Sequence, residues 1–193
     1  MSFLITAFGY GGTFAAYTYL SPILAGFGFS ASAVVIILIV YGIMVAIGNT
    51  IGGHFANAQP LASLMKMFGL LLVALVFLFV TVLLGNTILG LSAALLLGLF
   101  AFMNVPGLQL YVVELAEKYV PKDITLASAL NIAAFNIGIT LGSTIGAQVT
   151  GKIGLAYTPI FGAVIVLLAI LLIVQVRKSE SVESIDPMSE CEK

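Results

Sequence analysis

The chain has 193 residues, of which 61% are hydrophobic and 8% are charged, and its formal net charge is −1. Soluble globular domains carry about 25% charged residues, so this composition excludes a water-soluble fold, and its hydrophobicity excludes intrinsic disorder. The charge balance offers no basic surface for nucleic acid. One histidine and one cysteine are too few for a disulfide framework or a zinc site, so we expect no metal and no cofactor. The sequence predicts an all-α integral membrane protein.

Charged residues divide the chain into long apolar blocks. Residues 1–65, 67–113, 124–151 and 153–176 contain no Asp, Glu, Lys or Arg. A membrane-spanning helix needs about 20 apolar residues, and turn residues near 26–30 and 85–86 divide the two longer blocks. The sequence therefore predicts one domain, residues 1–178, followed by a disordered cytoplasmic tail over 179–193. Six transmembrane helices are expected, at about residues 3–24, 32–53, 67–84, 88–111, 126–149 and 159–176.

The basic residues predict the orientation of these spans. With the amino terminus inside, only Lys152 lies outside, and the positive-inside rule then puts both termini in the cytoplasm. We expect a multi-pass protein of the cell membrane, a bacterial inner membrane, with the lipid bilayer as its surroundings. The inside segments hold the other basic residues, which are Lys66, Lys118, Lys122, Arg177, Lys178 and Lys193.

Polar residues are distributed unevenly among the spans. The third and sixth are almost purely apolar and can face lipid all round, whereas polar groups in the other four need partners or water at membrane depth. We expect those four to surround a polar cavity, with the third and sixth outside them. This order predicts a 3+3 inverted repeat of three helices. The segments Gly48-Asn-Thr-Ile-Gly52 and Gly142-Ser-Thr-Ile-Gly146, 94 residues apart, support the repeat.

Tyrosine rings next to amide side chains suit a cavity for a small polar or amphipathic solute. The alternative for each polar side chain is an interhelical hydrogen bond, worth about 0.6 kcal/mol in membranes. The candidate cavity residues are Tyr10, Thr13, Tyr17, Asn49, Asn104, Gln109, Asn131, Asn136 and Thr140.

Glycines and one proline bear on packing and bending. Gly138, Gly142 and Gly146 recur every four residues, as do Gly48 and Gly52, so each set lies on one helix face and favours close helix packing. Within the fourth span, Pro106 removes a backbone donor and kinks the helix. That kink is either a hinge or a tolerated irregularity.

Three stretches resemble the carboxy-terminal six-helix half of a major facilitator superfamily transporter, in the drug:proton antiporter branch that includes arabinose-efflux permeases. Residues 8–22 resemble that branch's seventh helix, 48–57 its cytoplasmic loop motif after helix eight, and 126–138 its helix eleven. The resemblance implies efflux of a sugar- or drug-like small-molecule solute. The loop motif departs from the family, because Asn57, Ala58 and Gln59 replace its usual acid and basic residues.

Proton coupling needs an ionisable group within the membrane, and the predicted spans hold no carboxylate, lysine or arginine at mid-depth. We therefore expect a truncated or partial chain whose partner is a missing amino-terminal half that supplies the coupling. Two alternatives stay open: a free-standing transporter or channel formed with a second copy, and a non-transporting membrane interaction protein. The sequence contains no Gly-x-Ser-x-Gly, no His-Glu-x-x-His and no phosphate-binding loop, so an enzyme is not expected.

Overall fold

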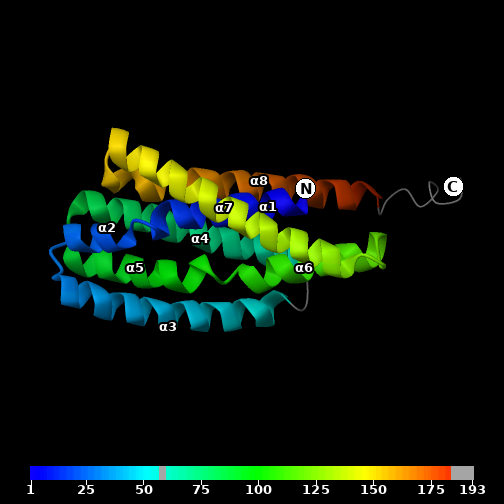
Figure 1. The fold of residues 1–193 in the computed structure, drawn as a ribbon, viewed down its shortest axis with the longest axis horizontal. Helices are drawn as coiled ribbons and strands as arrows, with labels where there is room; N and C mark the ends of the chain where they lie inside the picture. Colours follow the sequence, from blue (N-terminus) through cyan, green and yellow to red (C-terminus); the bar gives the residue numbers. More distant parts are fainter. Residues whose placement is uncertain (57–59, 184–193) are drawn as a thin grey trace, which may run out of the picture.

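The computed structural model describes residues 1–56 and 60–183, and those residues form helices and turns without a strand. The helices run along one long axis, and the start of α1 and the end of α8 point to the same end of the bundle (Figure 1). In chain order the elements are α1 (Ser2–Tyr17), α2 (Leu20–Gly26), α3 (Ala31–Ala56), α4 (Pro60–Leu84), α5 (Thr87–Ala101), α6 (Val105–Tyr119), α7 (Ile124–Lys152), the short 3₁₀ helix η1 (Leu155–Tyr157) and α8 (Thr158–Glu183).

Five helical stretches are long and apolar enough to cross a membrane. They are α3, α4, the combined stretch of α5 and α6 (Thr87–Tyr119), α7, and Leu155–Ser179. The predicted all-α membrane fold is thereby confirmed. The expected first span is divided between α1, with 16 residues, and α2, with 7. Neither helix alone is long enough to be counted as a membrane-spanning stretch. A count of six transmembrane spans therefore stays a prediction. At the other end α8 is helical beyond Ser179, as far as Glu183, and the rest of the expected tail, 184–193, lies outside the described residues, as do Asn57, Ala58 and Gln59.

Both helix breaks lie just before a proline. The interruption between α1 and α2 begins at Thr18, four residues before Pro22, and that between α5 and α6 begins at Phe102, four residues before Pro106. A proline has no N–H for the carbonyl four residues earlier, and its ring clashes with that carbonyl. Each proline therefore interrupts its helix one turn upstream (Figure 1).

The expectation that α4 and α8 can face lipid all round is wrong. On one face α4 buries Phe68, Leu71 and Leu75, and α8 buries Val166 and Ile173; the two helices pack against each other and α1. Long rows of apolar side chains are instead exposed on α3 and α7. Apolar composition could not separate these cases, because lipid and a protein core favour the same residues.

Glycine faces bring two pairs of helices into backbone contact. A Cβ on Gly48 or Gly52 of α3 would overlap the carbonyl oxygens of Leu99 and Met103. On α7, a Cβ on Gly142 would overlap the carbonyl of Gly11, and one on Gly146 would lie 2.7 Å from Ala15 O. The matched glycines are 94 residues apart, and the carbonyls they approach are 88 apart. The second span of the first repeat, α3, thus packs on the first span of the second repeat, α5 with α6. In the same way α7, the second span of the second repeat, packs on α1, and this reciprocal packing supports the inverted repeat.

Candidate functional site

Six aromatic rings from four parts of the chain meet inside the bundle. Tyr10, Phe14 and Tyr17 share one face of α1, because they are spaced by four and three residues. The other three rings come from α3, from the break between α5 and α6, and from α7. We call this group the aromatic surface; it consists of Tyr10, Phe14, Tyr17, Tyr41, Phe102 and Phe135.

The rings pack mostly edge to face. Tyr10 lies 4.5 Å from Phe135 at 70° between ring planes, and 5.8 Å from Phe102 at 84°. Tyr17 lies stacked on Tyr41 at 5.4 Å. Edge-to-face and offset pairs are favourable, worth about 0.5–1.5 kcal/mol beyond the buried area.

Phe102 connects the break to this surface. Its ring contacts Tyr10, Phe14 and Tyr17, at 5.8, 6.3 and 6.1 Å between centroids, while its backbone belongs to the interruption between α5 and α6. The Phe14, Tyr17 and Phe102 side chains are only partly buried. Several members of the aromatic surface are therefore partly exposed, and one of them lies on an irregular stretch of backbone.

Asn104, in the same interruption, has no hydrogen-bond partner for either atom of its carboxamide and is 0% exposed. The backbone bonds across the break run from Val105 N–H to Phe102 O (3.2 Å) and from Leu108 N–H to Asn104 O (2.9 Å). An amide buried without a partner costs about 1–3 kcal/mol by mutational measurement. Asn104 was expected to line a cavity, and in this structure its side chain is fully buried.

A chain of hydrogen-bonded polar side chains joins three helices near the N-terminal end of α1. The Thr6 hydroxyl donates to Asn131 Oδ1 (2.7 Å), and Asn131 Nδ2 donates to Gln109 Oε1 (2.9 Å). Gln109 Nε2 in turn donates to the Ser128 hydroxyl. Asn131 is 0% exposed, so this polar chain links α1, α6 and α7 by interhelical hydrogen bonds.

Replacing Asn131 by leucine is expected to lower the free energy of unfolding by about 1–2 kcal/mol, because it leaves Thr6 and Gln109 without their buried partner. Asn136→Leu is the matched control on the same helix, since that side chain is exposed and bonds only its own helix, at Ile132 O. The check is the midpoint of unfolding in mixed detergent micelles. Equal midpoints for the two variants would contradict the polar chain.

The remaining candidates do not join these groups. Thr13 is 0% exposed, and its hydroxyl donates to Gly9 O (3.2 Å) within α1. Asn49 lies exposed on α3, and Asn136 and Thr140 lie exposed on α7. The Thr140 hydroxyl donates to Asn136 O (2.9 Å). Sequence reasoning named Tyr10 and Tyr17 as candidates. The other four rings were not among the candidates, because single aromatics in apolar spans resemble core residues; these four are Phe14, Tyr41, Phe102 and Phe135.

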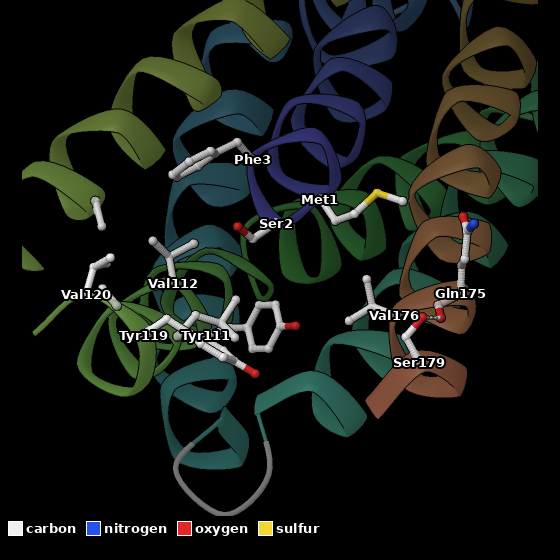
Figure 2. A pocket seen from close by; sticks show the side chains of 13 residues that line it. Met1, Ser2, Phe3, Tyr111, Val112, Tyr119, Val120, Gln175, Val176 and Ser179 are labelled. Atoms are coloured by element: carbon white, nitrogen blue, oxygen red, sulfur yellow. Dashed lines mark hydrogen bonds between the residues drawn. The ribbon is translucent and has the colours of Figure 1, made fainter. Parts of the chain in front are cut away.

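A separate cavity of about 470 Å³ lies at the end of the bundle where α1 begins. Figure 2 shows it among the first residues of α1, the C-terminal part of α6 and the end of α8, where the Ser179 hydroxyl donates to Gln175 O (3.2 Å). None of the candidate cavity residues lines it. Among the side chains of residues 1–56 and 60–179, no three of His, Cys, Asp or Glu lie together as metal ligands.

Comparison with known proteins gives several relatives, while no protein-family model matches the chain. The uncharacterised MFS-type transporter YtbD of Bacillus subtilis (strain 168) is 51% identical over 171 residues, which are 88% of this chain and 43% of the relative. The inner membrane transport protein YdhP of Escherichia coli (strain K12) is 33% identical over 172 residues, again 88% and 43%. A probable sugar efflux transporter of Pasteurella multocida (strain Pm70) is 29% identical over 85% of the chain and 39% of the relative.

The chain therefore spans less than half the length of each of these relatives. Among its described residues, five helical stretches are long and apolar enough to cross a membrane, as a multi-pass membrane protein requires. The chain is a multi-pass membrane protein that is similar, over almost nine-tenths of its length, to one part of a transporter of the major facilitator (MFS) type.

Proposed function

We propose that the chain forms the carboxy-terminal half of a secondary transporter that exports a small sugar- or drug-like solute. The aromatic surface is the observation that carries the proposal. It brings rings from α1, α3, the α5–α6 break and α7 to one place, and several of these side chains are partly exposed. Aromatic faces with hydroxyl tips bind the flat apolar faces of sugars and drug-like molecules. The efflux relative of Pasteurella multocida supports the direction of transport.

The proposed partner is the other half of such a transporter, seated on α3 and α7. Exposed apolar residues run along both helices, among them Ile39, Ile43 and Ile47 on α3 and Ile137 and Leu141 on α7. Exposed Asn136 and Thr140 on α7 would then face an interior rather than lipid. A second copy of the chain on these faces is the runner-up partner.

We further propose that the protein belongs to the drug:proton antiporter branch and lies in a bacterial inner membrane with both termini in the cytoplasm. The aromatic surface contains no ionisable carboxylate or amine, so in this proposal the proton-carrying group belongs to the other half. The nine candidate residues remain proposed members of the solute path, with Pro106 as its proposed hinge.

The transport proposal is tested in membrane vesicles that contain the protein as expressed from its own gene. Wild type is expected to move at least one labelled sugar or lipophilic cation against its gradient. Phe135→Leu is expected to raise KM about 2- to 10-fold, since it removes ring contacts worth about 0.5–1.5 kcal/mol.

Phe79→Leu is the matched control. Phe79 pairs with Tyr157 at 5.7 Å, away from the aromatic surface, and its loss is expected to leave KM unchanged. Vesicles that move none of the solutes, or a KM that rises equally in both variants, would refute the proposed site.

A further inference from the structure

Two asparagines occupy the residue before a helix in this chain, and only one of them caps its helix. Asn86 precedes α5 with extended backbone, φ −89° and ψ 113°, and its side chain accepts from Ile88 N–H (3.1 Å) and Leu89 N–H (3.0 Å). Asn104 precedes α6 with helical backbone, φ −80° and ψ −14°, and makes no such bond. The two residues differ mainly in ψ, and the extended value is the one a capping asparagine requires.

The bond that Asn104 lacks could be made within α6. A capping side chain accepts from the second or third N–H of its helix. The second residue of α6 is Pro106, which has no N–H, so the acceptor would bond Gly107 N–H. Because Asn104 is 0% exposed, another polypeptide packed on the outside cannot reach its carboxamide. A rearrangement of this chain can give it a partner.

We infer that the α5–α6 break is a two-state hinge and that Asn104 is its positioning residue. In the described state the backbone of Asn104 is helical and its carboxamide is unpaired. In the second state ψ of Asn104 turns to the extended region, its carboxamide caps α6 at Gly107, and α5 changes direction relative to α6. The unpaired amide destabilises the first state and the lost core packing destabilises the second, which brings the two close in free energy.

The hinge acts on the aromatic surface through Phe102. That ring contacts Tyr10, Phe14 and Tyr17 of α1 and lies two residues before Asn104. Turning α5 relative to α6 therefore moves Phe102 against α1 and changes which ring faces are accessible. This consequence rests on the proposed transport function, whereas the hinge itself does not.

The test measures the distance between α5 and α6 in the protein as its gene encodes it, reconstituted in lipid. Spin labels are placed at Ile88→Cys and Glu117→Cys, both exposed positions, with Cys191→Ser to remove the native thiol. Wild type is expected to show two distance populations. Asn104→Leu, which cannot cap, is expected to show one population and a higher midpoint of thermal unfolding.

Asn104→Ser supplies the control, since serine caps helices about as well as asparagine and is expected to restore both populations. Should the leucine variant fail to insert, Asn104→Ala gives the same prediction with a smaller side chain. A single population in wild type, or the same two populations in the leucine and serine variants, overturns the hinge. Loss of one population in vesicles that transport no solute keeps the hinge and rejects the transport function.

Discussion

Replacing Gly52 of α3 by alanine is expected to lower the free energy of unfolding by about 3 kcal/mol. The added methyl group would overlap the carbonyl oxygen of Met103 and lie 3.0 Å from its Cα. Overpacking usually costs about 1–3 kcal/mol, and this position belongs at the upper end because the obstacle is backbone. A flexible side chain could rotate away, whereas the Met103 carbonyl can move only if the helices separate.

Gly42 provides the matched control on the same helix, because a Cβ there has nothing within 4 Å. Gly42→Ala is expected to be neutral or stabilising by up to about 1 kcal/mol, as alanine favours helix more than glycine. The measurement is the unfolding midpoint of both variants in mixed micelles of dodecyl maltoside and SDS. If Gly52→Ala unfolded at the same midpoint as Gly42→Ala, α3 would not be held on Met103 as described.

Close packing of α3 lies directly beside the break between α5 and α6. Pro106 interrupts the hydrogen bonding of the fourth predicted span. The carbonyls of Leu99 and Met103 lie against Gly48 and Gly52 of α3, where a glycine Cα–H can approach an oxygen closely. The carbonyl that loses its donor to Pro106 is that of Phe102, which accepts from Val105 N–H (3.2 Å), so the glycine contacts and the break are separate features of this span.

The all-α membrane fold could be predicted from sequence because long apolar blocks are local features. The sequence did not predict the break between α1 and α2, although Pro22 indicates one. A proline near the expected end of a span is also typical of an ordinary helix end. The core faces of α4 and α8 could not be predicted, since Phe68 or Val166 suits lipid as well as protein. Composition shows that a helix is apolar. Whether each of its faces contacts lipid or the protein core depends on the neighbouring helices.

The candidate site shows the same division. Tyr10 and Tyr17 share one face of α1 because they are seven residues apart on one helix. Gln109 and Asn131 come from different spans, and their hydrogen bond (2.9 Å) depends on how α6 packs on α7. Phe102 belongs to the aromatic surface because the interruption between α5 and α6 places its ring against α1. Contacts between helices follow from packing, which a single sequence does not encode in its local pattern.

A second large effect is expected where α1 meets α7. Gly142→Ala would place a methyl group on the backbone of Gly11, overlapping its carbonyl oxygen and lying 2.7 Å from its carbonyl carbon. We expect a loss of about 3 kcal/mol in the free energy of unfolding. Gly151→Ala, on the same helix with nothing within 4 Å, is the control and should not destabilise the protein.

The neighbouring Ser143 decides which force holds this interface. Its hydroxyl lies 2.9 Å from the Thr18 hydroxyl, so Ser143→Ala removes one interhelical hydrogen bond, worth about 0.6 kcal/mol in membranes. The bond from Tyr19 Oη to the Ser143 carbonyl (3.1 Å) survives the change. If close glycine packing dominates, Gly142→Ala shifts the unfolding midpoint several times further than Ser143→Ala. A larger midpoint shift in Ser143→Ala than in Gly142→Ala would mean that hydrogen bonds hold α1 on α7. The glycine contacts that the two repeats share, at Gly48 and Gly142, would then contribute little to stability.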